Sequence, residues 1–376
     1  MTDNTQRQYQ PQAVPHPGEM LVDYLEAYDW TQRELSRRSG LTPKTISEIC
    51  SGKAPISPIT ALSLENVFRR PAHFWLNLQR LFDEHRARES SQLGRSVWAD
   101  WAAQFPIREL RSIGMLPESG KPVNDLLSFF GVASPDAWKS VFASENISYR
   151  QTRRHEINEY SVAAWVRATE VAAGEISIEP FDVDKLRESL EELRAVTRAP
   201  VETFVSSVQG ICAKAGVAVV WIPALKKTGI SGCARWLSDR KALVALTLRY
   251  KSDDQMWFTL FHEIGHLLLH RKNSSFILDD ILDLDSNLAD PEIFQQEEEA
   301  NRFAADVLIP PKAFRAFVYE RSFDSQSIYR FAEKIGISTG IVVGRLQKER
   351  YLRPDQGNML KRKLQISSVQ HSGEDQ

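Results

Sequence analysis

The feature that most constrains the fold is an apolar segment that carries two histidines and a glutamate at a fixed spacing. Residues 257–270 read WFTLFHEIGHLLLH. In a helix, His262 and His266 lie one turn apart on the same face. Two neutral imidazoles so placed can bind one Zn²⁺, and Glu263 can act as general base toward the water that the metal activates. Because unpartnered polar side chains are costly to bury, the segment predicts a metal-binding helix rather than a core helix with incidental histidines.

A metal held by two histidines needs a third protein ligand from another element. The segment 297–311, EEEANRFAADVLIPP, predicts a helix in which Glu297 and Asn301 share one face. We expect Glu297 to ligate the metal and Asn301 to hydrogen-bond a ligand histidine. The two glutamates that follow Glu297 are expected to point elsewhere, toward solvent. His270 is the rival third ligand, but it lies about 6 Å further along the first helix.

Together these two segments resemble the ImmA/IrrE family of metallopeptidases, over about 205 to 320. The matching residues of the second segment are Glu297, Ala300, Asn301, Phe303, Ala304 and Pro310. The resemblance implies a zincin-like fold with a small sheet over two helices, one Zn²⁺ per chain and, as in some members, cleavage of a transcriptional repressor. It also implies an edge strand near 242–248 that could bind an extended peptide by strand addition.

Three further residues lie near the expected sheet. Tyr250 follows the strand predicted at 242–248 and could stabilise an oxyanion, or it could be an aromatic cap at the strand end. Arg235 and Arg249 are expected to be surface charges rather than groups that clamp a substrate.

A second informative segment, 31–53, reads TQRELSRRSGLTPKTISEICSGK. Thr31 with Glu34 three residues later predicts a capping box at the start of one helix. Gly40 ends that helix in a tight turn, and Thr42 caps a second helix that begins with proline. Two short helices joined by a glycine-containing turn are typical of a helix-turn-helix.

The second helix would enter the major groove of double-stranded operator DNA with its N-terminus first. Lys44, Thr45 and Ser47 would face base edges, and the backbone near Thr31 and Gln32 would hold a phosphate. The full set of expected DNA contacts is Thr31, Gln32, Thr42, Lys44, Thr45, Ser47 and Lys53. The segment carries a local charge of only +3, so tight binding would need a homodimer. The alternative is a helical hairpin that docks a protein.

Residues 16–80 resemble the Cro/C1-type fold of HigA-type antitoxins. The matching features are His-Pro-Gly-Glu at 16–19, Thr-Gln at 31–32, Ile-Ser at 46–47, Gly-Lys at 52–53 and the ending at 75–79. The resemblance implies a DNA-binding regulator whose protein partner is a cognate toxin or a repressor. Arg69 and Arg70 depart from the family's usual small loop residue, but they lie outside the expected reading helix.

The composition of the chain excludes several classes of protein. The chain has 376 residues, a net charge of −2 and three cysteines. The balanced charge excludes a uniformly basic nucleic-acid coat protein, although a local basic surface stays open. Few cysteines, no signal peptide and no apolar run of about 20 residues predict a cytoplasmic protein without a membrane partner.

These observations predict an α+β protein with an all-α helix-turn-helix domain, a helical middle region and a zincin-like domain. The expected divisions are a disordered tail at 1–15, the helix-turn-helix domain at 16–88, a helical linker at 95–200, the metallopeptidase domain at 201–350 and a second disordered tail at 354–376. In the linker, the expected core anchors are Trp98, Trp101, Trp138 and Trp165.

The leading hypothesis is a transcriptional regulator of the antitoxin or prophage-repressor type with a zinc peptidase domain that cleaves a protein partner. A second hypothesis keeps the DNA reader but gives the zincin-like domain a sensing or dimerisation role without turnover. A third makes the helix-turn-helix a docking module for a toxin.

Overall fold

The computed structural model describes residues 14–142, 157–247, 252–270, 275–278 and 291–364. The chain divides into two compact units, Met1–Ala99 and Asp100–Gln376, each of which is described by itself. No helix among these residues is long and apolar enough to cross a membrane.

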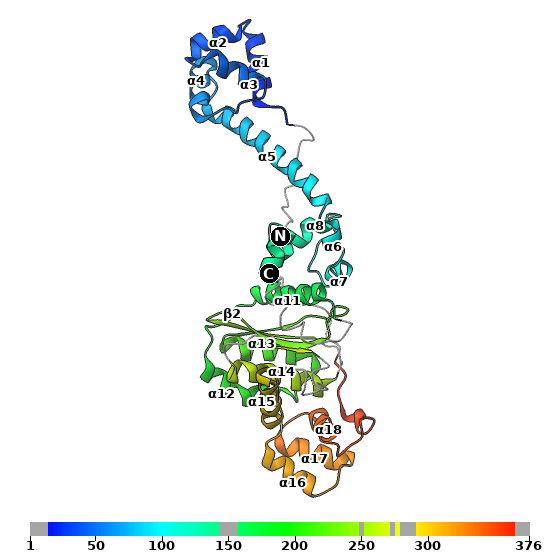
Figure 1. The fold of residues 1–376 in the computed structure, drawn as a ribbon. Coiled ribbons are helices and arrows are strands. Elements are labelled where there is room, and N and C mark those ends of the chain that lie inside the picture. The colour runs from blue at the N-terminus through cyan, green and yellow to red at the C-terminus, as the bar shows by residue number, and fades with distance from the viewer. Residues whose placement is uncertain (1–13, 143–156, 248–251, 271–274, 279–290, 365–376) are drawn as a thin grey trace. The chain divides into compact units, whose positions relative to one another are not determined.

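The described part of the first unit is helical (Figure 1). Its helices are α1 Pro17–Ala27, α2 Gln32–Ser39, α3 Pro43–Cys50, α4 Pro58–Phe68 and α5 Ala72–Ser96. They enclose a core whose fully buried members include Leu21, Leu35, Leu64 and Trp75. Burying a large apolar side chain stabilises the fold by about 1.5–3 kcal/mol, so this small unit depends on these few residues.

The expected turn between α2 and α3 is confirmed. Gly40 ends α2 in the left-handed conformation, with φ of 73°, and the Thr42 side chain accepts a hydrogen bond from Thr45 N–H at the start of α3. Thr31 likewise caps α2 by accepting from Glu34 N–H at 3.1 Å. The capping box is only half present, because the Glu34 carboxylate instead accepts from the side chains of Arg37 and Arg38.

The His-Pro-Gly-Glu sequence begins α1 and brings it against α3. His16 Nδ1 accepts from Gly18 N–H at 2.9 Å, while Glu19 accepts from His16 N–H at 3.1 Å. A side chain at Gly18 would overlap the carbonyl of Ile49, so only glycine allows the two helices to approach this closely. The motif is therefore explained by packing and capping of the helix-turn-helix.

The second unit is built on a sheet of strands β1 Val217–Trp221, β2 Ile230–Ser238, β3 Lys241–Leu246 and β4 Ser275–Leu278. The strand order is β1-β3-β2-β4, with β1 parallel to β3 and the other neighbours antiparallel. The expectation of an edge strand near 242–248 is wrong, because β3 is hydrogen-bonded on both sides. Peptide addition along β3 is excluded.

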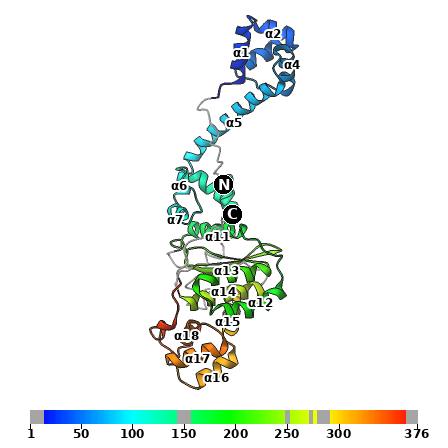
Figure 2. The same ribbon diagram turned by 180° about the vertical axis from the view of Figure 1, so that it is seen from behind.

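Helices cover both faces of the sheet (Figures 1 and 2). One face packs against α11 Glu159–Gly174, and Trp165 of this helix donates to the carbonyl of Ile222 at 3.2 Å. The other face packs against α13 Val201–Lys214 and α14 Asp253–Leu269. Helix α12 Val183–Val196 packs on α13, and α15 Pro291–Leu308 packs on α14. The predicted α+β class is confirmed.

Short helices flank this central layer. Before it come α6 Ala99–Ala102, α7 Ile107–Ser112, α8 Pro122–Phe130 and α9 Pro135–Phe142. Of the four expected tryptophan anchors, Trp101, Trp138 and Trp165 are buried, whereas Trp98 is only half-buried.

After the central layer come α16 Pro311–Tyr319, α17 Ser325–Ile335, α18 Thr339–Lys348 and the 3-10 helix η2 Asn358–Leu360. Residues 354–364, expected within a disordered tail, instead contain η2 and pack against the start of α14. The side chain of Arg362 donates to Asp253 at 3.1 Å, and Lys361 pairs with Asp254 at 2.7 Å.

Candidate metal centre and DNA-reading face

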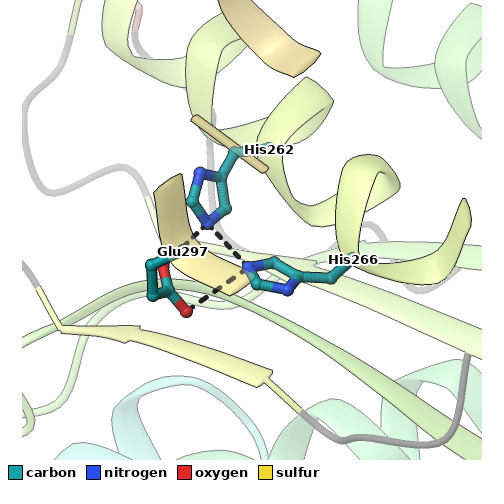
Figure 3. A group of neighbouring side chains, drawn as sticks. All are labelled: His262, His266 and Glu297. Carbon is teal, nitrogen blue, oxygen red and sulfur yellow. Dashed lines mark hydrogen bonds and ion pairs between the residues drawn. The ribbon is translucent and has the colours of Figure 1, made fainter. Parts of the chain in front are cut away.

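Three side chains converge between α14 and α15 (Figure 3). The Nε2 atoms of His262 and His266 lie 2.8 Å apart. The carboxylate of Glu297 lies 3.1 Å from His262 Nε2 and 3.4 Å from His266 Nε2. All three ligand atoms fall within 4.8 Å of one another. Two imidazole nitrogens and a carboxylate oxygen that point at a common centre form a donor set that fits Zn²⁺.

Close packing of the two helices makes this convergence possible. Gly265 faces α15, where an added Cβ would lie 3.0 Å from the ring of Phe303 and 3.4 Å from the Cα of Ala300. A larger residue would push α15 outward. Because Ala300 lies one turn after Glu297, the contact at Gly265 also fixes how far the Glu297 carboxylate reaches toward α14.

Burial and the ion pairs set the charge states of the three groups. Burial raises the pKa of Glu297, but hydrogen bonds from His262 and His266 outweigh it and lower this pKa to about 2. Burial also lowers the pKa of His266 below its usual value. An ionised carboxylate beside a histidine that tends to be neutral is the protonation pattern that metal ligands need.

Asn301 holds one of the histidines in place. Its Oδ1 lies 3.0 Å from His262 Nδ1. In the tautomer whose Nδ1–H donates to this oxygen, the lone pair of Nε2 is free for a metal. Among the described residues, His266 Nδ1 has no hydrogen-bond partner.

His270, the rival ligand, stands apart from the converging group. It follows the last residue of α14, and its Nε2 lies 3.6 Å from Glu299. Glu299 points away from the converging group, as expected, and its side chain is 42% exposed beside His270.

Glu263 is completely buried next to the two histidines. Its carboxylate lies against Gly232 of β2, where an added Cβ would be 2.9 Å from Glu263 Oε1 and 2.7 Å from Thr259 Cγ2. Sequence reasoning missed both β2 and Gly232. The signal was present, since an isolated glycine inside a strand indicates a bulge or a close approach.

Of the three residues predicted near the sheet, the structure describes one. Tyr250 and Arg249 lie outside the described residues. Arg235 is not a surface charge, because it is only 8% exposed and its Nη1 lies 3.0 Å from Glu170 of α11. Its strand position turns it away from the metal centre, toward the face that α11 covers.

The predicted DNA-reading residues lie on the α2–α3 surface. Thr31, Gln32, Thr42, Lys44, Ser47 and Lys53 are exposed. Thr45 is half-buried, and its hydroxyl lies 2.8 Å from that of Thr42. Ile46 and Ile49 are fully buried on the opposite face of α3, as expected.

Comparison with known proteins follows the same two regions. The family model described as helix-turn-helix matches residues 21–75. The uncharacterised HTH-type transcriptional regulator YddM of Escherichia coli is 30% identical over 81 residues, which are 22% of this chain and 86% of that protein. The chain belongs to the helix-turn-helix transcriptional regulators. The family model described as IrrE N-terminal-like domain matches residues 234–347, so this regulator also carries a peptidase-family domain.

Other similar proteins each cover about a fifth of the chain. Virulence-associated protein A of Dichelobacter nodosus is 40% identical over 67 residues, which are 17% of this chain and 66% of that protein. A HigA-family addiction module antidote protein from Coxiella burnetii is 30% identical, with coverage of 22% and 91% and a TM-score of 0.22. Pseudomonas aeruginosa antitoxin HigA with the higBA promoter is 28% identical, with coverage of 23% and 91% and a TM-score of 0.21.

The contact at Gly232 gives a direct prediction. Gly232→Ala should lower the free energy of unfolding of the second unit by about 1–3 kcal/mol, because the added methyl group overpacks the space that Glu263 and Thr259 occupy. Urea unfolding measures the change. Gly210→Ala is the matched control, since nothing lies within 4 Å of its added Cβ. In the Gly232→Ala protein, a second change of Thr259→Ser should restore part of the lost stability, because it removes the Cγ2 atom near the added methyl group. Equal stability of Gly232→Ala and Gly210→Ala would contradict the close contact assigned to Gly232.

Proposed function

We propose that this regulator is of the antitoxin or prophage-repressor type and that its peptidase-family domain is a zinc-dependent endopeptidase that cleaves a protein partner in the cytoplasm. The observation that carries the proposal is the convergence of His262, His266 and Glu297, with Glu263, the residue after His262, buried on the same helix. A single helix supplies both histidines and the glutamate, and the neighbouring helix supplies the third ligand.

Each residue has a distinct role. His262, His266 and Glu297 hold one Zn²⁺ per chain, and Asn301 orients the His262 ring. When bound, Zn²⁺ is a Lewis acid that polarises the scissile carbonyl and lowers the pKa of water. Glu263 accepts the proton of the attacking water at a carboxylate oxygen and delivers it to the departing amine.

Tyr250 is the proposed donor to the oxyanion that forms at the attacked carbonyl. The water oxygen first bonds to the carbonyl carbon, and the peptide C–N bond breaks when the oxyanion collapses and the amine takes the proton from Glu263. These steps need no oxidant, reductant or further cofactor.

Glu263→Gln tests the role of the base. The amide keeps the shape of the side chain but cannot take a proton, so zinc content should stay unchanged while cleavage falls by at least 100-fold. Incubation of the variant with candidate repressor or toxin proteins that the wild-type protein cleaves, followed by mass spectrometry of the products, measures cleavage. Glu298→Gln is the matched control, because Glu298 is exposed on the other side of α15. A Glu263→Gln protein that still cuts its partner would show that the proton-transfer role is wrong.

A second function is favoured by the burial of the centre. His262 and His266 are 2% exposed, Glu297 is 7% exposed and Glu263 is fully buried. Such burial suits a zinc ion that stabilises a sensing or dimerisation domain without turnover. In that case the zinc-loaded wild-type protein would cleave no partner, and Glu263→Gln would change only stability.

The α2–α3 surface is proposed to read operator DNA as a homodimer through Thr31, Gln32, Thr42, Lys44, Thr45, Ser47 and Lys53. Caps and buried isoleucines hold α3 in place while its polar side chains project outward. A helix in this position can enter the major groove.

The double substitution of Lys44 and Thr45 by Ala should weaken binding to the chain's own promoter by roughly 30-fold or more, because two base contacts worth about 1–3 kcal/mol each are lost. Fluorescence anisotropy with the promoter duplex measures this change, and a scrambled duplex reports on non-specific binding. Unchanged promoter affinity would instead favour the third hypothesis, in which this surface docks a toxin.

A further inference from the structure

The C-terminal helical region, residues 311–364, called here the C-terminal cap, is strongly basic. It contains twelve Lys and Arg against five Asp and Glu, which is a formal charge of +7. The whole chain has a net charge of −2, and the α2–α3 segment carries only +3. The cap therefore carries more positive charge in total than the segment 31–53 does, at about the same net charge per residue.

Internal ion pairs use only some of this charge. Arg345 pairs with Glu349, Arg353 with Asp355, and the two residues Lys361 and Arg362 with acidic residues of α14. The other basic residues of the cap are exposed and make no ion pair with any residue that the structure describes. They are Lys312, Arg315, Arg321, Arg330, Lys334, Lys348, Arg350 and Lys363.

Half of these residues lie on the outer faces of α16 and α17, next to exposed tyrosines. Lys312, Arg315 and Tyr319 recur along one side of α16 at helical spacing, and Tyr319 is 88% exposed. The opposite side of α16 packs on α17, where the rings of Phe317 and Phe331 stack at 4.1 Å.

Helix α17 presents a comparable outer face. Tyr329, Arg330 and Lys334 are all exposed on it, and Tyr329 is 56% exposed. The two helices lie side by side at one end of the second unit in both views (Figures 1 and 2). The outer faces of both helices carry basic side chains without ion-pair partners among the described residues, which is the electrostatic footprint of a nucleic-acid-binding surface.

The cap also repeats the turn of the DNA-reading module, but it cannot read a groove. Gly336 ends α17 in the left-handed conformation and Ser338 caps α18, as Gly40 and Thr42 do for α2 and α3. Unlike α3, however, α18 is buried against α14.

Two glycines seat α18 against the start of α14. A side chain at Gly340 would overlap the Asp253 carboxylate, and one at Gly344 would lie 2.7 Å from Asp254 Oδ2. The Asp253 carboxylate also accepts from the hydroxyl of Ser338. Helix α18, which corresponds to the reading helix α3, therefore packs against the metal-binding helix α14 and cannot contact bases.

We propose that the outer faces of α16 and α17 bind the phosphate backbone of double-stranded DNA without reading its sequence. Unpaired Lys and Arg release counterions from DNA when they contact phosphates, and this supplies most of non-specific affinity. The choice of DNA as the polyanion rests on the proposed DNA binding, because a second contact in the same chain strengthens a weak reader through its high local concentration. No reading helix is needed for this role.

Salt dependence of binding tests the proposal on the full-length protein. A cap variant replaces four basic residues by Gln: Lys312, Arg315, Arg330 and Lys334. A control variant makes the same change in net charge elsewhere on the second unit, at four exposed positions: Arg108, Lys185, Lys214 and Arg240. Affinity for a duplex of random sequence is measured by anisotropy across a salt series. Both variants should melt at the wild-type temperature, since every substituted side chain is exposed.

The cap variant should flatten the slope of log K against log salt by about two to four units, at roughly 0.9 per lost phosphate contact. The control variant should change the slope by less than about one unit. Equal slopes for the two variants would overturn the proposal. Competition by polyglutamate against the duplex at equal charge concentration would also overturn the proposal, because the cap would then be a surface that binds acidic proteins.

The experiment separates this proposal from the proposed reading of the operator. Repeating it with Lys44 and Thr45 replaced by Ala removes the reading face. If the cap-dependent slope persists there, the cap binds DNA whether or not α3 reads an operator. If the cap substitutions no longer change the salt slope once Lys44 and Thr45 are replaced, the cap makes no contact of its own and the proposal fails.

Discussion

The close contact between α14 and α15 at Gly265 is the constraint on which the candidate metal centre depends. A helix can present His262 and His266 on one face by its own geometry, but it cannot supply a third ligand at the same point. Glu297 reaches that point because Gly265 has no side chain, so that Phe303 and Ala300 of α15 can pack directly against α14. The charged carboxylate then offsets the cost of burying two imidazoles in an apolar helix.

The sheet and the C-terminal cap also contact α14, one near Glu263 and the other at the start of the helix. At the sheet, Gly232 leaves the space that Glu263 occupies. At the start of the helix, the buried Asp253 accepts hydrogen bonds from Ser338, which caps α18, and from Arg362, near the end of the described residues. The C-terminal cap is therefore a support for the metal helix on its inner side and a basic surface on its outer side.

The local features of the fold could be predicted from the sequence, whereas the tertiary ones could not. Caps at Thr31 and Thr42 and the pairing of His262 with His266 follow from residue type and spacing within one helix. The position of β3 inside the sheet does not, because it depends on the pairing of β3 with both β1 and β2, which come from other segments of the chain. Burial of Arg235 also escaped prediction, since it depends on Glu170, a partner far away in the sequence.

The most direct test of the central claim is the metal content of the purified full-length protein, measured by mass spectrometry beside two variants. The account predicts about one zinc per chain in the wild-type protein and in Glu298→Ala, whose side chain is exposed. Glu297→Ala should lose most of its zinc, because the two histidines alone do not complete a structural or catalytic site. Full zinc occupancy in Glu297→Ala, or a wild-type protein that binds no zinc, would contradict the account.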